Sequence, residues 1–94
     1  MITLDNTSLE YFSFGDNPDD EFYLLINTKL NPDPIDIERL KRISPTSFEH
    51  VLNDMGCIMM LDGHEVNELV RRGDADRENL HASLFEVAKR EGIL

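Results

Sequence analysis

Runs of aromatic and branched residues dominate the first part of the chain. The segments LEYFSF (residues 9 to 14) and EFYLLIN (residues 21 to 27) have the composition of β-strands, and the turn-forming run GDNPDD lies between them. This pattern predicts a β-hairpin whose tip carries a cluster of acidic side chains. The opening residues ITL (2 to 4) are a candidate for a further short strand, joined to the hairpin by a turn at Asp5 and Asn6.

Both strands of the expected hairpin are apolar on both faces. Because successive side chains of a strand point to opposite faces, the apolar residues fall into two sets. Leu9 and Tyr11 oppose Phe12 and Phe14, and Phe22, Leu24 and Ile26 oppose Tyr23 and Leu25. A strand pair of this kind needs cover on each side. Either the sheet curls around the helices, with its second face partly covered by residues 2 to 4 and a chain terminus, or that face or an edge meets a partner.

The pattern becomes helical after the run NPDP (residues 31 to 34). Asp33 and Pro34 are a helix cap and first-turn pair, which predicts a helix over 34–43. Thr46 and Glu49 have the spacing of a capping box, and the apolar positions that follow predict a second helix.

Gly56 leaves two alternatives for the run CIMML (residues 57 to 61). The glycine can end the second helix, which makes this run a short buried strand. It can also lie inside a longer helix, at a cost near 1 kcal/mol. We favour the break at the glycine.

Asp62 and Gly63 also support two interpretations. An Asp-Gly pair between apolar runs is a strong hairpin signal, but Asp62 and Glu65 have capping-box spacing. The apolar period downstream is helical, so we predict a helix over about 63–72 that ends at Gly73. A C-terminal helix then begins at Asp74 or Asp76 and is closed by Gly92, with a buried stripe formed by Leu80, Leu84, Val87 and Ala88.

These elements predict a single α+β domain over residues 1–94. An N-terminal β-hairpin or small antiparallel sheet in a β-rich acidic segment (1–32) is followed by three to four short helices in a mainly helical segment (33–94). No apolar run approaches the roughly 18 to 20 residues that span a membrane, and the start lacks the features of a signal peptide. Cys57 is the single cysteine, which excludes an intramolecular disulfide. We therefore expect a cytoplasmic protein with no membrane association.

The negative charge is concentrated early in the chain. The formal net charge is −10, but residues 1–38 hold nine acids against Lys29 alone, whereas residues 39–94 hold ten acids and eight bases. The first segment therefore carries −8 and the second −2. Such a field repels nucleic acids and anionic membranes, and it attracts cationic protein surfaces over roughly 8 to 10 Å. The alternative interpretation is that the carboxylates have no binding role and only keep the domain soluble.

The sequence offers little for catalysis or metal binding. His50, Cys57 and His64 stand seven residues apart, but seven residues advance a helix by about 10.5 Å, too far for three ligands to converge on one zinc ion. Cys57 is flanked by apolar residues, which should raise the pKa of its thiol and not activate it. Calcium loops, phosphate-binding loops and nucleophile motifs are absent from the sequence. We expect a protein that is not an enzyme and needs no cofactor or metal.

The last two expected helices and the short turn between them (residues 65 to 91) superficially resemble a helix-turn-helix with arginines near the junction. Three acids are interleaved with these arginines; the six residues are Arg71, Arg72, Asp74, Asp76, Arg77 and Glu78. A recognition helix needs a basic footprint to offset phosphate repulsion. We expect these arginines to pair with neighbouring carboxylates, and we expect no direct nucleic acid binding.

Two classes of function remain. The first is a small acidic binding factor, such as an inhibitor, immunity-type or regulatory protein, that engages a basic partner surface and imitates the charge of nucleic acid. The second is a structural or assembly subunit that forms a homo-oligomer through the apolar hairpin. The residues expected to bind the partner in the first case are Tyr11, Phe12, Phe14, Asp16, Asp19, Asp20, Glu21, Phe22 and Tyr23.

Overall fold

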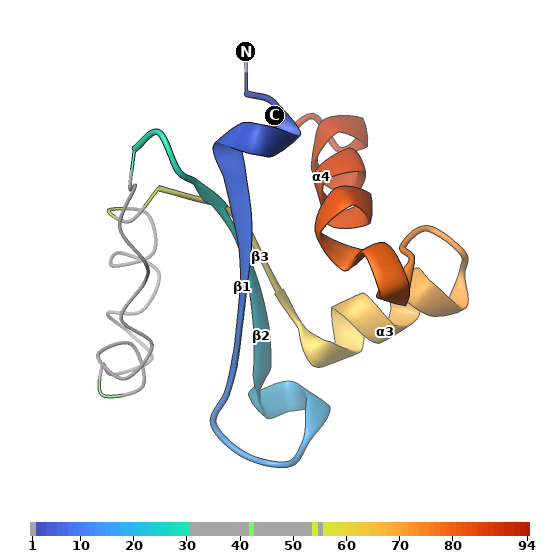
Figure 1. The fold of residues 1–94 in the computed structure, drawn as a ribbon. Coiled ribbons are helices and arrows are strands. Elements are labelled where there is room, and N and C mark those ends of the chain that lie inside the picture. The colour runs from blue at the N-terminus through green and yellow to red at the C-terminus, as the bar shows by residue number, and fades with distance from the viewer. Residues whose placement is uncertain (1, 31–41, 43–53, 55) are drawn as a thin grey trace.

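The computed structural model describes residues 2–30, 42, 54 and 56–94 (Figure 1). Three strands, two α-helices and three short 3-10 helices follow one another along these residues. Their bounds are η1 Leu4–Asn6, β1 Thr7–Ser13, η2 Pro18–Asp20, β2 Glu21–Asn27, β3 Cys57–Asp62, α3 Gly63–Arg71, η3 Arg77–Asn79 and α4 Leu80–Arg90. The chain therefore has an α+β fold in which an antiparallel sheet precedes the two helices.

The sheet is antiparallel, with β2 between β1 and β3. The expected hairpin is confirmed, with Tyr11 opposite Tyr23 and Phe12 opposite Phe22, although β1 begins at Thr7 and not at Leu9. Residues 57–61 form a strand, as favoured from the sequence. Gly56 has a positive φ of 76°, a conformation that favours glycine, so it marks the start of β3. The sheet therefore takes its third strand from the segment expected to be mainly helical.

Two expectations about the elements are corrected. The opening residues do not form a strand, because Leu4–Asn6 is a 3-10 turn. This turn is held by Asn6, whose backbone N–H donates to the Thr3 carbonyl at 3.0 Å and whose side-chain amide donates to the Thr3 hydroxyl at 2.9 Å. The described residues contain two α-helices and not three to four. The helices expected over 34–43 and after Thr46 lie outside the described residues.

Helix α3 begins as the sequence predicts. The Asp62 carboxylate accepts a hydrogen bond from the Glu65 backbone N–H at 2.8 Å, and the Glu65 carboxylate accepts one from the Asp62 backbone N–H at 3.3 Å. This capping box satisfies backbone donors at the helix N-terminus. The helix ends at Arg71, just before Gly73 with its φ of 80°. The next helix, α4, is preceded by the turn η3, which Asp76 caps by accepting the Glu78 backbone N–H at 3.0 Å.

Helices α3 and α4 lie on one side of the sheet (Figure 1). Leu25 of β2 packs against Phe85 and Ala88 of α4 in the core, together with the partly buried Ile58 and Met59. Leu84, Val87 and Ala88 confirm most of the stripe expected on α4, whereas Leu80 is only partly buried.

Leu24 and Ile26, on the opposite face of β2, are also buried. Both apolar faces of the central strand are therefore removed from solvent within a single chain. This agrees with the interpretation in which the sheet is covered on each side, but Ile2, one of the residues expected to cover the second face, packs instead against Leu25, Phe85 and Ala88 on the helix side.

Candidate functional site

The acidic tip of the hairpin is a folded turn. The backbone N–H of Phe14 donates to the Asp20 carbonyl, and that of Asp20 donates to the Asn17 carbonyl, each at 2.9 Å. Pro18 begins the short helix η2, where its missing N–H costs no hydrogen bond. Asp16 and Asp19 are exposed, whereas Asp20 is partly buried. The turn therefore presents carboxylates to solvent from a defined backbone.

This tip is attached to the start of helix α3, which the sequence did not indicate. The Asp19 carboxylate lies 2.7 Å from Nε2 of His64, and both side chains are largely exposed. Gly63, the first residue of α3, packs closely against the tip. A Cβ atom built there would be 2.7 Å from the Pro18 carbonyl oxygen and 2.5 Å from Glu21 Oε2. The contact between η2 and α3 depends on the absence of a side chain at position 63.

Gly63→Ala should therefore destabilise the protein, although alanine normally favours a helix over glycine. The new methyl group would meet the Pro18 backbone, which cannot move as easily as a side chain, so we expect a loss of about 1 to 3 kcal/mol in the free energy of unfolding. Gly15→Ala is the matched control, because its Cβ would meet the flexible Asp20 carboxylate at 2.7 Å. Urea denaturation of both variants measures the difference, and equal stabilities would contradict the close approach of η2 to α3.

Two further carboxylates join the tip at the same end of the molecule. Asp62 ends β3 opposite Phe22, and Glu65 lies one helical turn into α3, while η2 contacts both β3 and α3. We call this group the anionic end, and its members are Asp16, Asp19, Asp20, Glu21, Asp62 and Glu65. His64 is the one basic side chain among the described residues that pairs with a member of the anionic end. The capping-box spacing of Asp62 and Glu65 was visible in the sequence, but their position beside the tip depends on the pairing of β2 with β3.

Tyr11 lies beside the anionic end and is 49% exposed. Its hydroxyl donates to Glu21 Oε1 at 3.1 Å, and its ring lies 4.9 Å from that of Tyr23 between centroids. Desolvation against the sheet, reinforced by the Glu21 carboxylate, raises the pKa of the Tyr11 hydroxyl. Tyr11 therefore presents a neutral phenol, half exposed, beside the Glu21 carboxylate.

The three phenylalanines expected at the site form a separate cluster. Ring centroids lie 5.3 Å apart for Phe12 and Phe14, 5.4 Å for Phe12 and Phe22, and 5.7 Å for Phe14 and Phe22. Strand alternation places Phe12 and Phe22 on the face of the sheet opposite Tyr11 and Tyr23. Phe12 is only 3% exposed, whereas Phe14 is 48% exposed. The nine residues predicted from the sequence therefore do not share one face, and Phe12 packs inside the protein.

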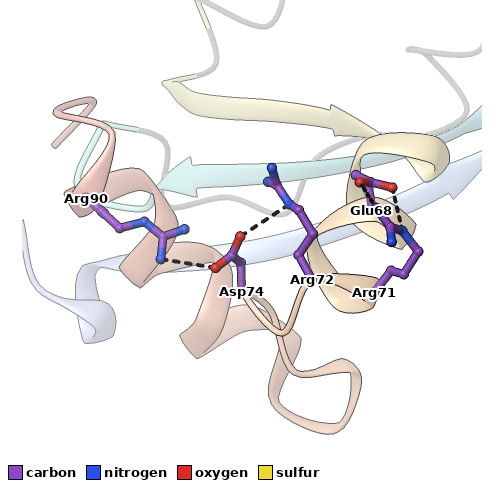
Figure 2. A network of polar contacts seen from close by, with 5 residues as sticks. All are labelled: Glu68, Arg71, Arg72, Asp74 and Arg90. Carbon is purple, nitrogen blue, oxygen red and sulfur yellow. Dashed lines mark hydrogen bonds and ion pairs between the residues drawn. The ribbon is translucent and has the colours of Figure 1, made fainter.

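The arginines near the helix junction are engaged by acceptors from neighbouring residues (Figure 2). Arg71 forms a bidentate pair with Glu68, and Arg72 Nε lies 3.4 Å from the Asp74 carboxylate. Asp74 also lies 3.6 Å from Arg90 of α4, so it links the ends of the two helices. This confirms the expected pairing for Arg71 and Arg72. Arg77 differs, because it donates to the side-chain carbonyl of Asn67.

Cys57 has the properties of a structural thiol. It is partly buried at the start of β3, and its thiol donates weakly to the Met59 carbonyl at 3.5 Å. Desolvation raises the pKa of the thiol to about 11, in the direction that its apolar neighbours predicted. Within the part of the chain that the structure describes, no group of three or more His, Cys, Asp or Glu side chains is placed to hold a metal ion. His50 lies outside that part.

Alkylation of Cys57 by iodoacetamide should be slow at pH 8. A thiol with a pKa of about 11 is roughly 0.1% ionised at that pH, so we expect a rate at least about tenfold below that of a free cysteine peptide. Because the folded pKa is raised, the rate should climb about tenfold per pH unit up to pH 10. Mass spectrometry of the alkylated fraction measures this rate. A rate equal to that of the peptide at pH 8 would show that the thiol is not desolvated.

Comparison of the chain with protein-family models, curated proteins and solved structures finds no match. Among the described residues, no helix has both the length and the apolar character that crossing a bilayer requires.

Proposed function

We propose that this chain is a small acidic binding factor of the cytoplasm, of the inhibitor, immunity or regulatory type, that engages a basic surface of a partner protein. One observation carries this proposal: carboxylates from η2, β2, β3 and α3 gather at one end of the molecule beside the half-exposed ring of Tyr11. We propose no catalytic activity, no direct contact with nucleic acid and no membrane association.

Electrostatic attraction is the first contribution of the anionic end. The anionic end contains six carboxylates, and among the described residues His64 is the one basic side chain that pairs with any of them. The whole chain has a formal net charge of −10. A field of one sign raises association rates by about 10 to 1,000-fold for a partner of opposite charge, and the effect falls steeply with ionic strength. A basic partner that normally binds phosphates would meet anionic oxygens in their place.

Preorganisation is the second contribution. The carboxylates of Asp62 and Glu65 are held by the capping box, that of Asp19 by His64 and that of Glu21 by Tyr11. Side chains that are already ordered lose less entropy on binding. Tyr11 provides a rigid aromatic contact beside these charges, and tyrosine is enriched among residues that dominate binding energy.

The competing assembly function receives less support. It requires apolar hairpin surface for self-association, yet Leu24, Leu25 and Ile26 are buried in the single chain. A negatively charged end also repels a second copy of itself. We therefore favour a heterologous basic partner over a homo-oligomer.

The test is capture of partners from the native host at two salt concentrations, followed by purification of the captured protein and measurement of the mass of this chain in solution. We expect a basic protein that binds at about 50 mM salt and is largely released at about 500 mM, and a mass equal to one chain. Self-association that salt does not weaken, with no basic partner, would favour the assembly function instead.

A further inference from the structure

Strand β1 forms an outer edge of the sheet. Among the described residues it pairs with β2 alone, and the register of this pair has no shift over the seven residues of the strand. Strand edges in proteins are commonly protected by proline, lysine, a bulge or a short length. The sequence of β1, TSLEYFS, has neither proline nor lysine, and Glu10 is its one charged residue. This edge is therefore a regular template for a further strand.

Alternate residues of β1 direct their backbone polar groups to the free edge. In an antiparallel pair, residues that exchange hydrogen bonds alternate with residues whose N–H and C=O groups point away from the partner strand. At one end of the β1–β2 pair the Phe14 N–H donates to the Asp20 carbonyl at 2.9 Å, and at the other end the Thr28 N–H donates to the Asn6 carbonyl at 2.8 Å. Both bonds place the even-numbered residues of β1 in the pairs that bond to β2. The N–H and C=O groups of its odd-numbered residues therefore point outwards.

Leu9 and Tyr11 are the odd-numbered residues in the middle of β1. Thr7 differs from them, because its N–H already donates to the Leu4 carbonyl. The side chains of Leu9 and Tyr11 lie on one face of the sheet and that of Glu10 lies on the other. No ion pair between described residues includes Glu10. The free edge therefore combines outward-pointing backbone groups with a carboxylate that has no basic partner among these residues.

The position of Glu10 selects a basic occupant. An antiparallel strand that bonds to Leu9 and Tyr11 places the residue between its two bonded residues directly opposite Glu10. Directly opposite residues point to the same face, and their side chains come closest in this type of pair, which exchanges no hydrogen bonds. A lysine or arginine at that position meets the Glu10 carboxylate. The residues on each side of it lie opposite Leu9 and Tyr11, where apolar side chains find apolar neighbours.

A second copy of β1 fits this edge poorly. The antiparallel register in which both copies use the outward groups of Leu9 and Tyr11 pairs Leu9 of one copy with Tyr11 of the other. It therefore sets Glu10 directly opposite Glu10. Like charges in directly opposite positions destabilise a strand pair, and each copy also has a formal net charge of −10. The edge thus disfavours self-pairing for the same reason that it favours a basic strand.

We propose that β1 receives an extended segment of a partner protein with the order apolar, basic, apolar. The segment adds to the sheet as an antiparallel strand, its apolar residues bond to the backbone of Leu9 and Tyr11, and its basic side chain pairs with Glu10. The inference rests on the proposed function, since it names the segment that the basic partner contributes. The anionic end attracts the partner, and β1 holds it.

Synthetic peptides test this edge. The probe is a capped seven-residue peptide with a central lysine, a valine on each side of it and two threonines at each end, long enough to cover β1. A comparison peptide has glutamate in place of the lysine. Binding to the isotope-labelled protein is followed by NMR titration. We expect the probe to bind at least about tenfold more tightly than the glutamate peptide. The amides of Leu9 and Tyr11 should become protected from exchange with solvent, because they gain hydrogen bonds.

A matched pair of methylated probes tests the hydrogen bonds. In the proposed register the amides of the valines donate to β1, whereas the amide of the lysine points away from it. Methylation of one valine nitrogen should therefore weaken binding at least about fivefold, and methylation of the lysine backbone nitrogen should change it less than about twofold. The two peptides have the same composition and charge, so their difference reports the backbone pairing alone.

A pair of charge reversals tests the role of Glu10. We expect Glu10→Lys to weaken the probe about three- to tenfold and to strengthen binding of the glutamate peptide, whereas Glu78→Lys on η3 should change either affinity less than about twofold. Because the pair with Glu10 forms only after docking, the loss should appear in the dissociation rate of the basic partner and not in its association rate. Circular dichroism confirms that both variants fold.

Several outcomes would overturn the proposed strand addition. These are shifts confined to the hairpin tip, equal binding of the two methylated probes, equal effects of the two reversals, and a dimer of the parent protein that already protects the amides of Leu9 and Tyr11. In the first three cases the protein still binds a basic probe, so the proposed function stands while the strand addition fails. Failure of every probe also rejects the strand addition, and failure of the host capture experiment as well would reject both.

Discussion

Leu25→Ala should lower the free energy of unfolding by about 2 to 5 kcal/mol, the largest stability change that we expect from a single substitution. Leu25 is 1% exposed and packs against Phe85 and Ala88 of α4. Removing its side chain loses the transfer free energy of the buried carbons and leaves a cavity between the sheet and α4. For a domain of this size, such a loss is a large fraction of a total stability of about 5 to 15 kcal/mol.

Urea denaturation followed by circular dichroism measures this change. Leu30→Ala is the control, because Leu30 is 73% exposed and the same truncation there should cost no more than about 0.5 kcal/mol. A loss below about 1 kcal/mol for Leu25→Ala would mean that the contact between β2 and α4 does not hold the two layers together.

Neutralising the hairpin tip should produce the largest functional effect. The variant carries Asp16→Asn, Asp19→Asn, Asp20→Asn and Glu21→Gln, which keep the side-chain shapes and remove four charges. We expect its association rate with the basic partner to fall about tenfold or more at low salt, because these carboxylates supply most of the field at the anionic end. Stopped-flow or surface-based kinetics with the purified partner measure the rate.

The same variant must be checked for folding, because Asp19 pairs with His64 and Glu21 accepts from Tyr11. Exposed pairs of this type contribute little to stability, so its urea midpoint should stay close to that of the parent protein. An association rate within about twofold of the parent at low salt would remove the tip from the binding mechanism.

Much of the local structure could be predicted from residues close together in the sequence. Turn formers between two strand-like runs predicted the β1–β2 hairpin, and the spacing of Asp62 and Glu65 predicted the start of α3. Gly56 and Gly73 both have positive φ angles at the boundaries where the sequence placed a break. In each case a few neighbouring side chains determine the hydrogen bonds of the backbone.

The features that could not be predicted depend on contacts between distant residues. The register shift between Leu25 and Ile26, the attachment of Asp19 to His64 and the close approach of Gly63 to Pro18 all require the pairing of β2 with β3. The opening turn differed because Asn6 hydrogen-bonds to Thr3, a local alternative that competes with strand formation. The predicted binding residues were divided between two faces of the hairpin once its register was set.

The salt dependence of association tests the central claim most directly. The tip variant is compared with a control that loses the same charge at scattered positions, through Asp5→Asn, Glu10→Gln, Glu78→Gln and Glu86→Gln. We predict that the association rate of the parent and of the control falls steeply as salt rises from about 20 to 500 mM, whereas the rate of the tip variant is low and nearly flat. Equal salt slopes for the two variants would contradict the account, because they would show that total charge acts without any contribution from its position.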